Sequence, residues 1–180
     1  MAIVVLDRDG VINVDSAQYI KSVDEWIPLP GSIEAIAALS QNGYRVYIAT
    51  NQAGLARKLF TLEDLTQMHN KLRRLVEESG GEISGIMFCP HHPDELCRCR
   101  KPNIGLLEAI ALEANEDLIG QAFVGDSLKD IQAAISMGCK PILVKTGNGR
   151  ETLKLVDSEI PVFDNLASYV SSLGLSNIQI

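Results

Sequence analysis

The sequence lacks any apolar run long enough to cross a lipid bilayer, since charged residues interrupt every such segment within a few positions. The opening run AIVVL, residues 2–6, ends at an aspartate and is too short for the core of a secretory signal peptide. These absences predict a protein of the cytoplasm with no membrane partner. In that reducing compartment, disulfides are not expected.

Positive charge is scarce as well. The chain carries 16 Lys and Arg against 23 Asp and Glu, a formal net charge of -7. Because nucleic-acid backbones reward excess positive charge, we expect no nucleic-acid partner. A small anionic substrate stays compatible with this balance, since its binding depends on the local charge of a pocket. We also expect a monomer.

The chain is poor in aromatic residues, at 5%, and has one tryptophan, but 46% of it is hydrophobic. That content is enough for one sizeable core at this length of 180 residues. No internal repeat, low-complexity tract or linker divides the chain. The sequence therefore predicts a single domain over residues 1–180.

Short apolar runs alternate with segments of helical periodicity, which is typical of an α/β fold with a doubly wound, Rossmann-like parallel sheet. We expect strands at residues 3–6, 45–49, 85–89, 122–125, 141–144 and 161–163. We expect helices within residues 31–43, 61–80, 103–115, 127–138 and 165–174, several of them ended by glycine.

Polar residues follow several of the predicted strands: Asp7 follows the first, Thr50 and Asn51 the second, Lys101 comes after the third, and Asp126 follows the fourth. The carboxyl ends of parallel strands share one edge of a sheet, where such folds bind ligands. Two carboxylates there favour Mg²⁺, which takes oxygen ligands. A phosphate would complete its shell and accept hydrogen bonds from the threonine, asparagine and lysine.

The segment Asp7-Arg-Asp9-Gly10 indicates the reaction. One carboxylate can attack phosphorus and form an aspartyl-phosphate, while a second carboxyl two residues later acts as general acid and then as general base. Gly10 lets the chain turn away directly after the pair. The pattern predicts a phosphatase with Asp7 as nucleophile and Asp9 as acid/base.

Cysteine is rare, yet three of the four cysteines and two of the three histidines lie in CPHHPDELCRCRKP, residues 89–102. Thiolates and imidazoles at this spacing can close a tetrahedral zinc shell, and in a reducing compartment a metal site is favoured over disulfides. The spacing does not choose between His91 and His92. We expect a zinc-binding loop over residues 89–101.

DRDGVIN, TNQAGLAR, CPHH with CRCRKP, and VGDSLKD occur in the order seen in the haloacid dehalogenase superfamily of phosphatases, which the chain resembles over most of its length. Within it, the segments are similar to the subgroup of heptose 1,7-bisphosphate and histidinol-phosphate phosphatases. The resemblance implies a haloacid dehalogenase-type fold without a large cap domain. It also implies removal of the C7 phosphate of D-glycero-D-manno-heptose 1,7-bisphosphate, on the way to nucleotide-activated heptose and the lipopolysaccharide core, with histidinol phosphate as the alternative substrate.

The resemblance also implies roles for single residues. Mg²⁺ is expected at the Asp7 carboxylate, the Asp9 backbone carbonyl and Asp126. Substrate and phosphate are expected at Thr50, Asn51, Arg57, Arg100 and Lys101. Zinc is expected at Cys89, His91, Cys97 and Cys99, the Cys-x-His pattern of the subgroup favouring His91.

Some features leave alternatives open. Asp130 can support the metal through water or stabilise the start of its helix. Lys58 stands where relatives usually have glycine. A phosphoacceptor signalling module would also use aspartates, a threonine, a lysine and Mg²⁺, but would not need an acid/base two residues after the acceptor. A zinc-dependent binding module would leave the acidic strand ends unexplained.

Overall fold

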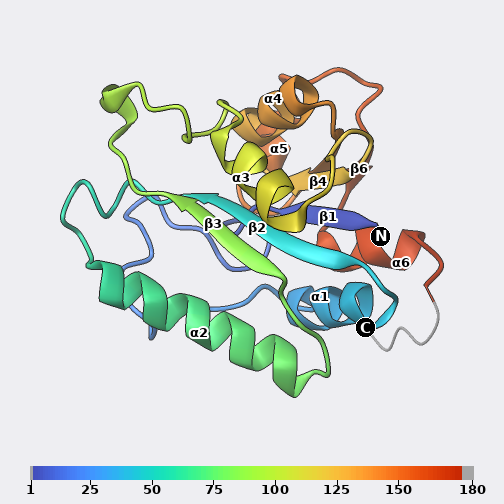
Figure 1. Ribbon diagram of the computed structural model, residues 1–180, viewed down its shortest axis with the longest axis horizontal. Coiled ribbons are helices and arrows are strands. Elements are labelled where there is room, and N and C mark those ends of the chain that lie inside the picture. Colours follow the sequence, from blue (N-terminus) through green and yellow to red (C-terminus); the bar gives the residue numbers. More distant parts are fainter. Residues whose placement is uncertain (1, 176–180) are drawn as a thin grey trace.

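The computed structural model describes residues 2–175 (Figure 1). Its strands are β1 (Ile3–Leu6), β2 (Arg45–Asn51), β3 (Gly85–Cys89), β4 (Ala122–Gly125), β5 (Lys140–Val144) and β6 (Val162–Phe163). Its helices are α1 (Ser32–Gln41), α2 (Leu62–Glu78), α3 (Gly105–Ala114), α4 (Leu128–Met137), α5 (Gly149–Thr152) and α6 (Leu166–Ser172), with a 3-10 turn η1 (Pro93–Glu95).

The six strands form one parallel sheet in the order β3-β2-β1-β4-β5-β6. β1 lies between β2 and β4, which brings the residues after these three strands to one edge. Helices α1, α2 and α6 lie on one face of the sheet, and α3 and α4 lie on the other (Figure 1). This is the doubly wound arrangement, in which the strand order reverses beside β1 and leaves a crevice at the carboxyl ends of the strands.

The alternation of side chains along β1 supplies both cores. Val4 and Leu6 pack under α1, α2 and α6, whereas Ile3 and Val5 pack under α3 and α4. All four are buried, as expected for the centre of a sheet covered on both faces. Burial on both faces of the sheet accounts for the uninterrupted apolar run IVVL of this predicted strand.

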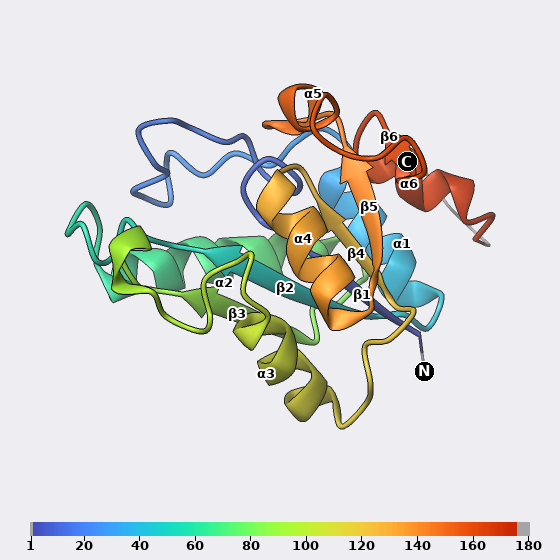
Figure 2. The same ribbon diagram turned by 90° about the horizontal axis from the view of Figure 1, so that it is seen from above.

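Three segments project from the carboxyl end of the sheet: the long connection after β1, the turn after β2 and the segment after β3 (Figure 2). The connection after β1 carries its own anchor, the fully buried Trp26. Lys71 of α2 fixes it by donating hydrogen bonds to the carbonyls of Val23, at 2.9 Å, and Trp26, at 2.8 Å. The loop is thus held firmly enough to form a wall of the crevice.

The expected elements are confirmed, with differences at their ends. Strand β2 runs two residues further than expected because Thr50 and Asn51 pair with Phe88 and Cys89 of β3. Helix α2 begins at the capping box between Thr61 and Asp64. The elements η1 and α5 were not expected, because three or four residues show no apolar period. None of the helices within residues 2–175 is long and apolar enough to span a bilayer.

Candidate active site

A cavity of about 410 Å³ opens at the carboxyl ends of β1, β2 and β4, within the size range of small-molecule sites. Its lining brings together seven of the predicted site residues, Asp130, whose role the sequence left open, and several residues that were not predicted. The predicted ones are Asp7, Asp9, Thr50, Asn51, Arg100, Lys101 and Asp126. Others are Asp15, Ser16, Tyr19, Gln52, Lys129, Asp130 and Asn148.

Lys101 lies buried between two carboxylates. Its Nζ is 2.9 Å from Oδ1 of Asp7 and 2.6 Å from Oδ1 of Asp130, and it donates to the carbonyl of Ala49 at 2.7 Å. Burial alone would lower the pKa of Lys101, but the charges of Asp130 and Asp7 outweigh it and raise the pKa. Lys101 is therefore a permanent cation beside the predicted nucleophile.

Three carboxylates, those of Asp7, Asp126 and Asp130, lie with oxygens within 4.8 Å of one another. Burial, followed by the charge of Asp130, raises the pKa of Asp126 to about 7 and that of Asp7 well above its usual range. Of the ion pairs in residues 2–175, only those of Lys101 reach these groups, which leaves two negative charges uncompensated. An all-oxygen cluster with excess negative charge fits a hard dication such as Mg²⁺.

Gly10 makes the approach of the two strand ends possible. Its φ of 84° lies in the left-handed region, and a Cβ at this position would collide with the carboxylate of Asp126. The prediction of a turn at Gly10 is confirmed, and the structure adds the reason why no larger residue fits. Asp126 can then face Asp7 and Asp9 across the crevice.

Asn148, which the sequence analysis missed, fixes Asp126. Its backbone N–H donates to Oδ2 of Asp126 at 2.7 Å, and its Nδ2 donates to the same oxygen at 3.2 Å and to Asp15 at 3.3 Å. The segment TGNG follows β5, so the rule that polar residues at strand ends form the site would have found it.

Asp130 lies in the first turn of α4 and completes a capping box with the N-cap residue Ser127: its Oδ2 accepts from the backbone N–H of Ser127 at 3.0 Å and from the Ser127 hydroxyl at 2.7 Å. Of the two roles left open for Asp130, the structure shows stabilisation of the helix start, and support of a metal stays a hypothesis. The contact with Lys101 is an additional role that the sequence did not reveal.

Asp9 is surrounded by donors. Arg8 contacts both of its carboxyl oxygens, Asn13 Nδ2 donates to Oδ1 at 2.9 Å and Gln52 Nε2 donates to Oδ2 at 2.8 Å. Burial would raise the pKa of Asp9, but the Arg8 charge and the hydrogen bonds from Asn13, Arg8 and Gln52 lower it overall. The resting site therefore favours the carboxylate form of Asp9.

His69 of α2 contacts the guanidinium of Arg8, the residue that holds Asp9. Its Nε2 is 3.2 Å from Nη1 of Arg8, and because a guanidinium can only donate, Nε2 is the acceptor and the proton resides on Nδ1. Burial, followed by the charge of Arg8, lowers the pKa of His69 to about 3. The side chain is thus neutral in the folded chain.

This lowered pKa predicts a pH dependence of stability. Between the ordinary histidine pKa of 6.5 and the folded value of about 3, the unfolded chain binds the proton and the folded chain does not, so stability falls as pH falls. We expect His69→Gln to remove about 2 kcal/mol of this loss between pH 7 and pH 5. Urea unfolding at both pH values measures this difference, with His92→Gln as the control. An equal loss of unfolding free energy between pH 7 and pH 5 in wild type and His69→Gln would contradict the prediction.

Thr50 and Asn51 take different positions at the cavity. The hydroxyl oxygen of the buried Thr50 accepts from Gln52 Nε2 at 2.9 Å. The hydroxyl hydrogen is therefore not used in this contact and can be donated to another group. The amide of Asn51 instead clamps the main chain of Lys101, accepting from its N–H at 3.0 Å and donating to its carbonyl at 3.2 Å. Phosphate binding by Asn51 stays a prediction, to which the structure adds the placement of Lys101.

The two predicted substrate arginines lie apart. Arg100 lines the cavity, and its Nη1 is buried without a hydrogen-bond partner among residues 2–175. Arg57 is exposed on the turn after β2 and is not part of the cavity lining, so its role stays a prediction. Lys58 beside it has a φ of 56°, which explains why glycine suits that position.

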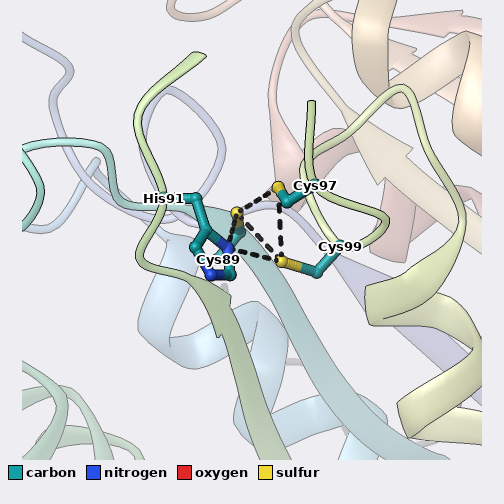
Figure 3. A group of neighbouring side chains, drawn as sticks. All are labelled: Cys89, His91, Cys97 and Cys99. Atoms are coloured by element: carbon teal, nitrogen blue, oxygen red, sulfur yellow. Dashed lines mark hydrogen bonds between the residues drawn. The ribbon is translucent and has the colours of Figure 1, made fainter. Parts of the chain in front are cut away.

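The cysteine cluster closes on itself. Cys89 at the end of β3 and His91 face Cys97 and Cys99 on the returning arm of the loop (Figure 3). Sγ of Cys99 is 3.1 Å from both Sγ of Cys89 and Nδ1 of His91, and the other sulfur pairs are 3.6 Å apart. A tetrahedral zinc ion holds its sulfur ligands about 3.8 Å apart, so this donor set fits zinc with every position filled.

The structure separates the two adjacent histidines. His91 turns Nδ1 toward Cys89 and Cys99, whereas Nδ1 of His92 accepts from the backbone N–H of Asp94 at 3.3 Å, at the start of η1. The alternative that spacing left open is therefore decided in favour of His91 at the cluster.

The chain is similar to several phosphatases. The HAD-hydrolase-like family matches residues 98–169. A D-glycero-beta-D-manno-heptose-1,7-bisphosphate 7-phosphatase of Pseudomonas aeruginosa is 53% identical over 96% of this chain and 97% of its own length. A protein of the same name from Neisseria meningitidis is 50% identical over 94% of this chain and 92% of its own length.

Solved structures agree with these sequences. A D,D-heptose 1,7-bisphosphate phosphatase of B. bronchiseptica, complexed with magnesium and phosphate, superimposes with a TM-score of 0.93 at 48% identity, covering 96% of this chain and 98% of that one. The corresponding phosphatase of Burkholderia thailandensis gives a TM-score of 0.76 at 39% identity, covering 98% and 100%.

Proposed function

Because the chain belongs to the heptose 1,7-bisphosphate phosphatase family of the HAD-like hydrolases, we propose that it removes the C7 phosphate of D-glycero-D-manno-heptose 1,7-bisphosphate. It is a Mg²⁺-dependent phosphoric monoester hydrolase of heptose and lipopolysaccharide precursor synthesis. The resemblance seen in the motifs is confirmed by these relatives. The single observation that carries the chemistry is Asp7, held by Lys101 among uncompensated carboxylates at the reversal of the strand order.

The first step is attack by Asp7 on the C7 phosphate. Its Oδ1 is held by the backbone N–H of Arg8 at 2.7 Å and by Lys101 at 2.9 Å, which leaves Oδ2 to form the bond to phosphorus. As the phosphorus–oxygen bond to the sugar breaks, Asp9 in its acid form gives the leaving oxygen a proton. The products are the heptose 1-phosphate and an aspartyl-phosphate on Asp7.

The second step is hydrolysis of the aspartyl-phosphate. Asp9, now a carboxylate, takes a proton from a water molecule whose oxygen attacks phosphorus, and the bond to Asp7 breaks to release inorganic phosphate. The donors around Asp9 lower its pKa and so favour the carboxylate form that this second step requires, whereas the first step uses the protonated form that each completed turnover regenerates. Thr50, Lys101 and the Arg100 side chain supply donors and positive charge for the phosphate oxygens.

The carboxylates of Asp7 and Asp126 and the backbone carbonyl of Asp9 would hold Mg²⁺, which when bound neutralises the site and the phosphate. The relative solved with magnesium and phosphate supports this choice of ion. The rest of the assignment is also part of the proposal: one catalytic domain over residues 1–180, with the loop 89–101 as its zinc site and Arg57 at its substrate entrance. We further propose a cytoplasmic monomer with no nucleic-acid or membrane partner.

Zinc at Cys89, His91, Cys97 and Cys99 would order the loop and do no chemistry, because four protein ligands leave no open position. A loop of this length cannot bury a core of its own, so metal binding can replace it. Arg100 follows the last ligand directly, while the Lys101 main chain is also held by Asn51. Loss of zinc should therefore displace Arg100 more than Lys101.

We expect Cys99→Ser to lose zinc and to lower kcat/KM by about tenfold to a hundredfold, mainly through KM, since a misplacement of about 1 Å costs this much. Elemental analysis and steady-state kinetics on the same preparation measure both effects. As a control, Cys139→Ser should keep its zinc, because Cys139 is buried and is not one of the four cluster residues. Loss of zinc with unchanged kcat/KM would show that the cluster stabilises the loop but does not position Arg100 for catalysis.

A panel of phosphorylated metabolites tests the proposed function. Phosphate release with Mg²⁺ is compared for the heptose 1,7-bisphosphate, histidinol phosphate and a generic aryl phosphate, and phosphorus NMR identifies which phosphate leaves the sugar. We expect the heptose bisphosphate to give the highest kcat/KM and a 1-phosphate product. A higher value for histidinol phosphate would overturn the substrate, and no release from any compound would overturn the enzyme class.

A further inference from the structure

Arg8, the residue between the two aspartates, lies outside the catalytic cavity. It is fully buried and does not line the cavity, whereas Asp7 and Asp9 on either side of it do. The Asp9 side chain keeps 21% of its surface exposed. Arg8 therefore cannot touch the substrate, but it touches the group proposed to carry protons to and from it.

The contact between Arg8 and Asp9 involves both carboxyl oxygens. Nη2 of Arg8 is 2.8 Å from Oδ1 and 3.1 Å from Oδ2, and Nε is 3.2 Å from Oδ1. Asn13 reaches only Oδ1 and Gln52 only Oδ2. Of these three donors, only Arg8 fixes the plane of the carboxyl group, because its guanidinium is a rigid fork.

The guanidinium is itself held from the other side. Nη1 of Arg8 donates to Nε2 of His69 at 3.2 Å, and the His69 ring lies 6.1 Å from the ring of Phe88 at a tilt of 58°. Helix α2 thus supports Arg8 from the face of the sheet opposite α3 and α4. The chain of contacts runs from the helix layer through Arg8 to the edge of the cavity.

Stability alone explains this arrangement poorly. Buried ion pairs are costly to desolvate, and apolar residues of similar volume often replace them without loss of stability. From the geometry we infer that Arg8 is a positioning residue, which holds the Asp9 carboxyl group in the orientation needed for proton transfer in both steps. The inference rests on the proposed phosphatase function.

A double-mutant cycle between Arg8→Met and Asp9→Asn tests the inference. We expect Arg8→Met alone to lower kcat by about tenfold to a hundredfold with KM within about twofold, because Arg8 does not contact the substrate. Asp9→Asn alone should lower kcat by about a hundredfold to ten-thousandfold. In the Asp9→Asn background, Arg8→Met should cost less than about threefold more, since the group it positions is gone.

Matched variants separate positioning from folding. Arg74→Met removes another arginine–carboxylate pair, the exposed one between Arg74 and Glu78 at 2.7 Å, and should leave kcat unchanged. Arg8→Lys keeps the charge but not the fork, so it should fall between wild type and Arg8→Met. If Arg8→Met does not fold, as judged by circular dichroism and zinc content, Arg8→Lys takes its place in the cycle.

The outcomes are distinct. Equal losses of kcat from the Arg8 substitution with and without Asp9, or wild-type kcat in Arg8→Met, would overturn the positioning role. Full activity of Asp9→Asn would instead overturn the proposed acid/base, whatever Arg8 does. A loss of kcat confined to the background with Asp9 intact supports the inference.

Discussion

Replacing Asp7 with asparagine should lower kcat/KM by at least about a thousandfold, because a carboxamide cannot form the bond to phosphorus on which the covalent route depends. The fold should survive the change. The asparagine oxygen can still accept from the backbone N–H of Arg8 and from Lys101, the two donors that hold Oδ1 of Asp7.

The urea unfolding midpoint provides a second test of this prediction. Burial and the neighbouring carboxylates of Asp130 and Asp126 raise the pKa of Asp7, so its charge destabilises the metal-free chain. The neutral isostere should therefore unfold in urea at an equal or higher midpoint when Mg²⁺ is absent. Asp164→Asn, an exposed aspartate paired with Lys145, is the control and should keep full activity. Turnover of Asp7→Asn near that of wild type would refute the nucleophile.

Lys101→Met is expected to damage both stability and catalysis. The substitution leaves the carboxylates of Asp7 and Asp130 buried without their cation, and breaking a buried pair in this way costs about 3–5 kcal/mol. Catalysis should fall by at least about a hundredfold, because a charged donor to the transferring phosphate is lost. Urea unfolding and steady-state kinetics measure the two effects.

A second substitution separates them. Asp130→Asn, added to Lys101→Met, removes one of the unpaired charges while its side chain can still accept from Ser127. We expect the double variant to regain part of the lost stability and none of the lost activity. If activity returned together with stability, Lys101 would be a structural cation, and phosphate binding would have to be assigned elsewhere.

Much of the fold could be predicted because its signals are local. The run IVVL reports burial on both faces of β1, and Thr61 with Asp64 marks the start of α2 by hydrogen bonds within one turn. The ends of elements were less certain. Strand β2 continues through Thr50 and Asn51 because these residues pair with β3. Pairing with a neighbouring strand gives no signal in the local sequence.

Within the candidate site, two residues with contacts to distant parts of the chain were missed. Asn148 reaches Asp126 across 22 positions, and Arg8 reaches His69 across 61. The residues adjacent to them in sequence do not reveal these contacts. From the sequence alone, Arg8 has no role other than to separate two aspartates. Its role becomes visible only from the burial of its side chain and its contacts with Asp9 and His69.

By itself, the sequence determined the doubly wound sheet, the order of the segments that meet at the cavity and the composition of the Cys/His loop. These depend on apolar periods, strand-end residues and ligands no more than ten positions apart. Only the tertiary structure decided that His91 and not His92 faces the cluster, that Lys101 joins Asp7 to Asp130, and that Arg57 lies outside the cavity. The reason is physical: a side chain's direction and partners depend on how separate loops pack at one edge of the sheet, and that packing is a property of the whole chain.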